Sequence, residues 1–279
     1  MGAQERNAFT AFALAGKGFS EKIPSQSNCC AQSMTPVPPT TSGNLREINH
    51  RFYDAMWRDA RLVEPQRFNT WPLITTLVAR SHRRLEVAPG LRPRLPIEGT
   101  HFLDLSVAAI EKLRARAASV TVGSITALPF ETAQFDLVCA FDIVEHVEDE
   151  EDALSELSRV CAGGGAFVLA VPLHPSRWTP FDEMVGHCRR YEPQRLLDKL
   201  RGHDFVVESS AAFGMQPKST PLLNLGIWWL THHRERAMWL YNRVMVPLGL
   251  HFQSKLSLHS GMIETAGVDE VLLVCRKRG

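Results

Sequence analysis

The sequence has no excess of charge of either sign, no C-x-x-C pair and no long apolar run. Its 31 basic and 30 acidic residues leave a net charge of +1, which argues against a nucleic-acid partner, because such proteins usually present a basic surface. Its apolar runs are shorter than the roughly 18 residues that a transmembrane segment needs. The N-terminus has a short apolar stretch interrupted by polar residues, which makes a poor secretory signal.

The cysteines are scattered along the chain. Cys139 and Cys275 lie in apolar segments, so we interpret the cysteines as reduced thiols in a cytoplasmic protein and predict no metal site. The chain has 279 residues, 44% of them hydrophobic, and can bury a sizeable core without disulfides or a structural metal. The length alone fits one large domain or two small ones.

Residues 1–43 show no periodicity typical of a helix or a strand. The second half of this segment is rich in Ser, Pro, Thr and Gln, so we predict a disordered tail. Asn44 is a suitable N-cap for a first helix. A second helix is predicted over residues 71–81, with a proline at a first-turn position. The structured domain is therefore expected over residues 44–279.

From residue 84 onward, short apolar strands alternate with amphipathic helices. This alternation predicts an α/β fold with N-terminal helices and a doubly wound, mostly parallel sheet of seven strands. In such sheets ligands bind beyond the carboxyl ends of the strands. The predicted strands cover residues 84–88, 101–105, 120–122, 135–141, 166–171, 205–207 and 271–275.

Residues 215–265 do not follow the alternation. Two apolar stretches rich in aromatic residues flank the polar segment THHRER, which predicts a helical insertion folded as a hairpin over the ligand crevice, a lid. Plain packing is one alternative. Peripheral contact with a membrane is another, because Trp beside Arg also suits a lipid interface.

Five short motifs carry a family resemblance. They read LEVAPG, HFLDLS, ITALPF, FDLVCAFDIVEHV and LSRVCAGGGAFVLAVP, within a match that covers about residues 84–214. In this order they resemble the class I S-adenosylmethionine (SAM) dependent methyltransferases, in particular the small-molecule enzymes that include those of quinone biosynthesis. The resemblance implies a Rossmann-like methyltransferase fold, SAM as cofactor and a small, hydrophobic methyl acceptor.

The first motif departs from the family pattern. The family has an acidic residue followed by G-x-G-x-G after the first strand. Here Glu86 stands for the acid, and Ala88 and Gly90 lie in a loop that keeps one glycine. The resemblance assigns all three to the cofactor site. Few residues, several of them prolines, separate Glu86 from Asp104, so the first crossover is predicted to lack its usual helix.

This departure leaves an alternative function open. A methyltransferase-like protein that has lost catalysis and serves in binding would tolerate the altered loop. A nicotinamide-dependent oxidoreductase is disfavoured, because the intact G-x-G-x-x-G that it needs is missing.

Two further strand ends are assigned to the cofactor. The resemblance implies that Asp104, at the end of the second strand, accepts hydrogen bonds from the ribose hydroxyls, because a carboxylate can accept two bonds from a diol. Leu105 follows it at the same edge. Ser124 and Ile125, after the third strand, are expected beside the adenine.

The fourth strand leads into the expected reaction centre. The resemblance places Phe141 and Asp142 behind the methionine part of SAM. His146 is the candidate general base, because an imidazole has a suitable pKa for proton removal from an acceptor. Alternatively His146 is structural, or it binds a divalent cation together with Asp142 and Glu145.

Four residues are candidates for contact with the acceptor. His187 and Tyr191 follow the fifth strand on the substrate side of the crevice. Trp57, in the N-terminal helices, and Trp229, in the insertion, are aromatic residues suited to covering the site. Ordinary packing is the alternative for both tryptophans.

Overall fold

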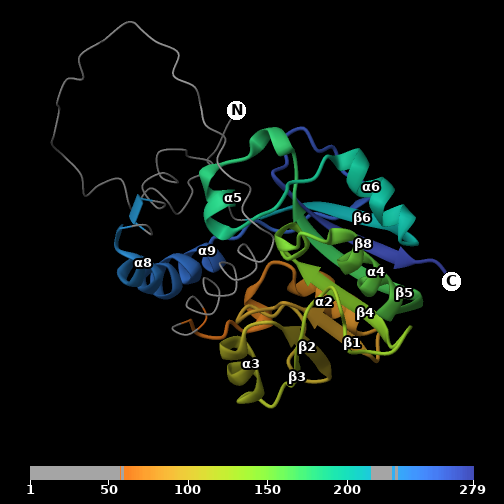
Figure 1. The fold of residues 1–279 in the computed structure, drawn as a ribbon, viewed down its shortest axis with the longest axis horizontal. Helices are drawn as coiled ribbons and strands as arrows, with labels where there is room; N and C mark the ends of the chain where they lie inside the picture. The colour runs from red at the N-terminus through yellow and green to blue at the C-terminus, as the bar shows by residue number, and fades with distance from the viewer. Residues whose placement is uncertain (1–56, 58–59, 215–227, 230–231) are drawn as a thin grey trace, which may run out of the picture.

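The computed structural model describes residues 57, 60–214, 228–229 and 232–279 (Figure 1). The predicted tail over residues 1–43 and the helix predicted to start at Asn44 lie outside the described residues. The helical elements of the described part are η2 (Pro65–Arg67), α2 (Trp71–Val78), α3 (Val107–Arg114), η3 (Val144–His146), α4 (Glu150–Val160), η4 (Pro175–Arg177), α5 (Pro180–Val185), α6 (Pro193–Gly202), α8 (Arg234–Leu240), η5 (Tyr241–Met245) and α9 (Val246–His251).

The strands form one mixed sheet in the order β3-β2-β1-β4-β5-β8-β6-β7. Strands β1 to β5 are parallel, and β8 lies antiparallel between β5 and β6. The mostly parallel, doubly wound sheet is therefore confirmed. The strands are β1 (Arg84–Val87), β2 (Thr100–Asp104), β3 (Ser119–Val122), β4 (Phe135–Phe141), β5 (Cys161–Pro172), β6 (Phe205–Phe213), β7 (His259–Ser260) and β8 (Glu270–Lys277).

The described residues form eight strands, one more than predicted. The additional strand is β7, whose two residues pair with Ser209 and Ser210 at the edge of the sheet. A strand of two exposed residues has no alternation of apolar and polar positions, so the sequence pattern does not predict it.

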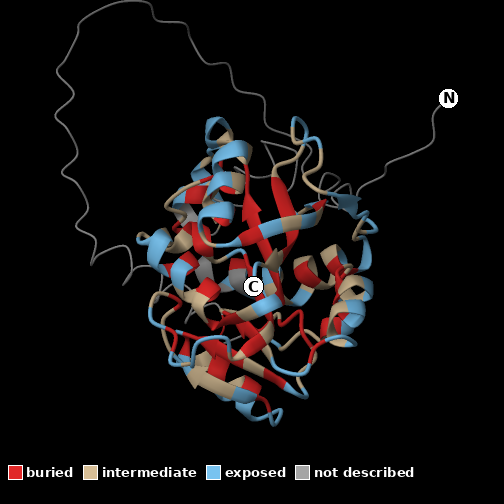
Figure 2. Ribbon diagram, turned by 90° about the vertical axis from the view of Figure 1, so that its right-hand side faces the viewer, coloured by how far each residue is buried: buried red, intermediate tan, exposed pale blue. Residues whose placement is uncertain are grey.

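The sheet is buried on both faces, as the apolar sequence of β4 predicts. Val138 and Ala140 belong to a core cluster with helices α4 and α6, whereas Leu137 and Cys139 belong to a second cluster that includes Ile74 of α2. Figure 2 shows the buried strands in the middle of the molecule, with the exposed residues around them. Helices on both faces leave the carboxyl ends of the parallel strands as the edge where a ligand can bind.

Strand β5 begins five residues earlier than the predicted strand over residues 166–171, so the glycine run of the last motif lies within a strand. Helix α4 ends at Val160, and Gly163, Gly164 and Gly165 fall within β5. The pairing between β4 and β5 shifts there, from Phe135 with Cys161 to Leu137 with Ala166. The glycines therefore form an irregular bulge at the start of a strand.

The first crossover has no helix, as predicted. Residues 88–99 are all described and contain only turns and irregular chain between β1 and β2. The segment is packed rather than loose, because Leu91 and Leu95 are fully buried. This loop lies at the carboxyl end of β1, at the edge of the sheet where ligands bind in α/β folds.

The insertion over residues 215–265 lies only partly within the described residues, so the hairpin stays a prediction. The N–H of His233 donates to the carbonyl of Trp229, and the N–H of Ala237 donates to that of His233, as in a helical run. The run continues through α8, the π-helical turn η5 and α9. Among the helices in the described part of the chain, none is long and apolar enough to cross a membrane.

Candidate cofactor and acceptor site

Glu86 holds the loop that replaces the first crossover helix. Its carboxylate accepts hydrogen bonds from the backbone N–H of Arg94 at 2.9 Å and of Leu95 at 2.8 Å. Burial raises the pKa of Glu86 to about 7, against the two backbone donors and Arg94, which lower it. Glu86 thus positions the loop through the hydrogen bonds that its carboxyl group accepts.

Asp104 connects the ends of β1 and β2. Its Oδ2 accepts the N–H of Gly90 at 2.8 Å, and its Oδ1 accepts the N–H of Ser106 at 2.8 Å. The Ser106 hydroxyl in turn accepts the N–H of Ala109 and caps α3. Two backbone donors thus fix the orientation of the carboxylate. Leu105, beside it, exposes 39% of its surface at the same edge.

The loop itself has an unusual backbone. Ala88 and Gly90 both have positive φ angles, 52° and 53°. A Cβ atom on Gly90 would lie 2.2 Å from the indole of Trp57, so only glycine fits beneath this ring. The carbonyl of Trp57 accepts a hydrogen bond from Lys112 of α3. Trp57 thus packs on the predicted cofactor loop, whereas the sequence placed it over the acceptor.

The loop after β3 joins the same edge. Gly123 donates its N–H to the Asp104 carbonyl at 3.1 Å. Ser124 is half-buried, and its hydroxyl bonds the hydroxyl of Thr126 at 2.8 Å. Ile125 is buried in the main core cluster. The structure therefore brings Ser124 and Ile125 to the strand end next to Asp104, as predicted from their positions.

Arg94 is a residue of the site that the sequence analysis missed. Its guanidinium carbon lies 3.7 Å from the ring centroid of Phe68, and 5.6 Å from those of both Phe141 and Phe213. Burial lowers the pKa of Arg94, and the nearby carboxylates of Asp142 and Glu86 oppose this effect. An arginine in a proline-rich loop is usually exposed. The sequence around Arg94 therefore does not indicate that aromatic rings surround its guanidinium.

Acidic residues gather around Arg94 at the end of β4. Asp142 has a φ of 51°, and its N–H donates to the carbonyl of Ala170 at 3.0 Å. Glu270, at the start of β8, is buried and shares a side-chain hydrogen bond with Asp142. Burial, with the charge of Asp142, raises the pKa of Glu270 well above its usual value.

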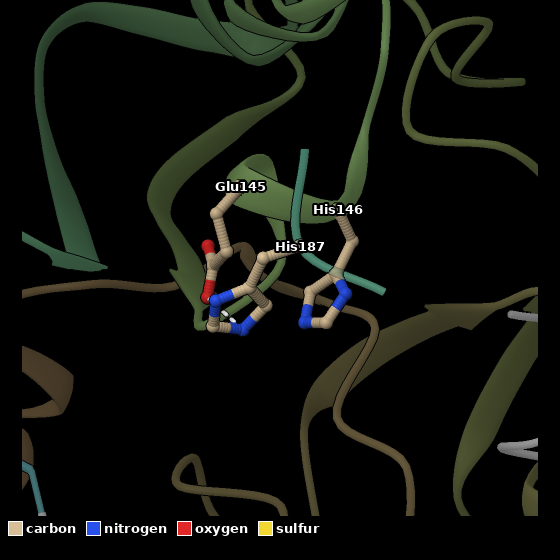
Figure 3. A group of neighbouring side chains, drawn as sticks. All are labelled: Glu145, His146 and His187. Atoms are coloured by element: carbon tan, nitrogen blue, oxygen red, sulfur yellow. Dashed lines mark ion pairs between the residues drawn. The ribbon is translucent and has the colours of Figure 1, made fainter. Parts of the chain in front are cut away.

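Next to this group, Glu145, His146 and His187 face one another (Figure 3). One ligand atom from each side chain lies within 4.8 Å of the others. The rings of His146 and His187 meet edge to face with centroids 4.6 Å apart. The predicted catalytic His146 and the predicted acceptor residue His187 are thus brought together, although they are far apart in the sequence.

The pKa values of Glu145 and His146 are shifted in opposite directions. Burial, and next the neighbouring Asp142, raises the pKa of Glu145 well above its usual range. Burial, and next His187, lowers the pKa of His146 to about 3. A neutral imidazole with so low a pKa is a weak proton acceptor at neutral pH. This environment disfavours the predicted role of His146 as general base.

Asp182 fixes the orientation of His187. It is fully buried and accepts the Nδ1–H of His187 at 2.8 Å. It also accepts two hydrogen bonds from Arg190, at 2.8 and 3.0 Å, and caps α5 together with Thr179. Burial alone would raise the pKa of Asp182, but its donors hold it well below the usual value. His187 is therefore held by an ionised carboxylate.

The remaining predicted acceptor residues lie elsewhere. Tyr191 is buried, and its hydroxyl donates to Glu150 at 2.8 Å, so it fixes the start of α4 and packs in the main core cluster. Trp229 is half-buried in the helical run of the insertion, whereas Trp228 and Trp239 expose 51% and 59% of their surface. The role of Trp229 at the acceptor stays a prediction.

Comparisons with known proteins agree with this topology. Residues 93–169 match the family model of a methyltransferase domain. Over 114 residues the chain is 32% identical to a probable S-adenosylmethionine-dependent methyltransferase of Mycolicibacterium smegmatis, a match that covers 39% of this chain and 44% of that protein. Over 113 residues it is 42% identical to the demethylmenaquinone methyltransferase of Streptomyces avermitilis, covering 39% and 48%. The matches span about half the length of these relatives.

A solved structure shares the fold over nearly its whole length. A SAM-dependent methyltransferase from Thermotoga maritima superposes with a TM-score of 0.51 and 16% identity, covering 85% of this chain and 96% of the other. The fold of this protein is that of the class I SAM-dependent methyltransferases. Within it, residues 93–169 are similar to the methyltransferase domain of this family.

Proposed function

We propose that the protein binds SAM across the carboxyl ends of β1 to β4 and transfers its methyl group to a small molecule. The observation that carries this proposal is the geometry of Asp104, whose carboxylate is fixed at the end of β2 by the N–H groups of Gly90 and Ser106. A carboxylate at this strand end is suited to accept hydrogen bonds from the ribose hydroxyls of SAM.

The surrounding residues suit the other parts of SAM. Gly90 holds the loop to Asp104 through its backbone N–H, so the loop lies beside the acid expected to bind the ribose. Leu105 is an exposed apolar residue beside Asp104, and Ile125 is a buried one after β3, so the two offer apolar contact to an adenine ring. Methyl transfer itself needs the acceptor held in line with the sulfur–methyl bond, at near-attack distance.

The acceptor proposed for this site is small and hydrophobic. Phe68, Phe141 and Phe213 provide aromatic surface around Arg94, at the strand ends where the methionine part of SAM is expected. The relative named for demethylmenaquinone supports a small-molecule acceptor. Proton removal is left to a group other than His146, because the low pKa of this imidazole makes it a weak base.

A catalytically inactive binding protein is the second candidate. The first crossover without a helix and the Trp57 indole over Gly90 favour it, since both alter the loop on which the family holds SAM. Calorimetric titration with SAM and S-adenosylhomocysteine tests the first proposal. Micromolar binding of both, together with methyl transfer from labelled SAM to a panel of hydrophobic acceptors, is expected. Binding without transfer would favour the second candidate, and absence of binding would refute the first.

A further inference from the structure

Glu145, His146 and His187 have the composition and spacing of a metal site. Each offers one ligand atom, and these atoms lie within 4.8 Å of one another. Metal–ligand bonds of about 2.0–2.2 Å bring the ligand atoms of one ion to within about 3–4 Å of each other. Nδ1 of His187 already bonds Asp182, and its Nε2 lies 3.9 Å from Oε1 of Glu145, too far for a hydrogen bond but a suitable distance between two ligands of one ion.

One oxygen of the Glu145 carboxyl group is buried without a hydrogen-bond partner among the described residues. The side chain is 1% exposed. Among the described residues, no group forms a hydrogen bond with its Oε2 atom. A buried carboxyl oxygen without a donor is costly, and a bound cation is one of the few partners that satisfies it. Figure 3 shows this carboxyl group turned toward the two imidazole rings.

The histidines are oriented by groups outside the cluster. Nδ1 of His187 donates to Asp182, and Arg190 and Thr179 fix that carboxylate in turn. A carboxylate that holds the far nitrogen of a histidine is the usual second layer of a metal site. Nδ1 of His146 lies 3.3 Å from the carbonyl oxygen of Gly186, which helps to fix the second ring.

We propose that Glu145, His146 and His187 bind one divalent transition-metal ion, with Asp182 as a positioning residue. Two imidazoles and one carboxylate suit Zn²⁺, Mn²⁺ or Fe²⁺, whereas Mg²⁺ and Ca²⁺ prefer sites built from oxygen ligands alone. Three protein ligands leave at least one coordination position for water or another oxygen ligand. In this proposal His146 is a metal ligand. This proposal concerns metal binding alone and does not depend on methyl transfer.

The test uses the full chain, stripped with a chelator and then titrated calorimetrically with ZnCl₂, MnCl₂ or MgCl₂. We expect one Zn²⁺ or Mn²⁺ ion per chain, bound at least about tenfold more tightly than Mg²⁺. Glu145→Gln and His187→Ala should each weaken binding more than about 100-fold, and Asp182→Asn about 10- to 100-fold. The matched control is His203→Ala, which removes a histidine paired with Glu151 on the surface at 2.9 Å and should leave binding unchanged.

A spectroscopic measurement separates lost ligands from lost folding. Co²⁺ bound to the wild type should give visible d–d absorption, and this spectrum should change in Glu145→Gln while the far-ultraviolet circular dichroism is retained. The proposal is wrong if no ion binds with a Kd below about 1 mM, or if Glu145→Gln and His187→Ala bind the ion as the wild type does. SAM titration of the same samples reports on the proposed function separately, so either proposal can fail alone.

Discussion

The backbone N–H of Gly90 donates to Oδ2 of Asp104 at 2.8 Å and thereby joins the end of β1 to the end of β2. This bond connects the one glycine that remains in the altered loop to the acid expected to bind the ribose. The loop and the acid therefore form one unit, although the helix that normally follows the loop is absent from residues 88–99.

Asp104→Ala should weaken SAM binding by about 1.5–3 kcal/mol, the usual range for hydrogen bonds to a charged group. Asp104→Asn should have an intermediate effect, because an amide retains one acceptor oxygen. Calorimetric titration with SAM measures both. Asp198→Ala removes an exposed aspartate that pairs with Arg201 and is the control. Wild-type affinity in Asp104→Ala would remove Asp104 from the cofactor site.

Gly90→Ala should destabilise the fold more than Gly164→Ala does. Both glycines have a positive φ, 53° and 75°, so both substitutions introduce backbone strain. Only the Cβ at position 90 meets the Trp57 indole, whereas a Cβ at position 164 has no heavy atom within 4 Å. We expect Gly90→Ala to lower the free energy of unfolding, measured with denaturant, by about 1–3 kcal/mol more than Gly164→Ala does. Equal losses would show that the indole moves away without cost.

Glu86→Gln should change how stability depends on pH. The folded-state pKa of Glu86 is raised from 4.5 to about 7, so its contribution is fully present below pH 4.5 and is lost as the pH rises toward 7. The free energy of unfolding of the wild type, relative to Glu86→Gln, should therefore fall by up to about 3 kcal/mol between pH 4.5 and 7. Urea unfolding of both proteins at several pH values measures this. A relative stability that rises with pH would mean that Glu86 is ionised throughout.

Much of the fold follows from strong local patterns. The prediction for β4 over residues 135–141 has the observed bounds, because the strand is apolar on both faces and flanked by polar residues. The start of β5 was predicted five residues too late, because glycine is common both after helices and in strand bulges, and only the partner strand decides between them.

The site was less predictable than the fold. Strand ends fix where Asp104 and Ser124 lie, so their positions follow from the topology. The aromatic neighbours of Arg94 come from three separate segments, and no periodicity connects them. His187 reaches His146 through the segment after α5, whose path depends on the bonds of the buried Asp182. Contacts of this kind arise from tertiary packing, which a single sequence does not encode locally.

Arg94→Met should destabilise the protein strongly. The guanidinium stacks on Phe68 and lies near the carboxylates of Asp142 and Glu86, which would lose their buried cation. Removing one partner from a buried charge group costs about 3–5 kcal/mol. Arg94→Lys should lose less, because it keeps the charge but not the planar stacking. Arg92→Met, on the same loop, is the control. If Arg94→Met costs no more than Arg92→Met, the charge of Arg94 contributes little to stability.

The insertion contacts the site through its buried face. Val246 and Leu250 of α9 pack on Phe68, and Phe68 covers the guanidinium of Arg94. The Tyr241 hydroxyl accepts a hydrogen bond from Arg92 of the same loop at 3.2 Å. These contacts link α9 through Phe68 and Arg94 to Phe141 at the carboxyl end of β4. Among the described residues, the insertion reaches the site through the aliphatic Val246 and Leu250 and through the Tyr241 hydroxyl.

Leu250→Ala should accordingly affect both stability and ligand binding, whereas Leu248→Ala, on the same helix, should affect neither. Leu250 is 7% exposed and Leu248 is 39% exposed, so the same truncation removes buried contacts in one case and surface contacts in the other. Loss of a buried leucine side chain costs about 2–5 kcal/mol, and a surface substitution usually costs less than about 0.5 kcal/mol. Because Phe68 would lose its support, the Arg94 loop should become less ordered and the Kd for SAM should rise several-fold. Thermal unfolding and SAM titration of both variants measure this. If Leu250→Ala lowers the melting temperature but leaves the SAM Kd unchanged, α9 stabilises the fold without organising the site.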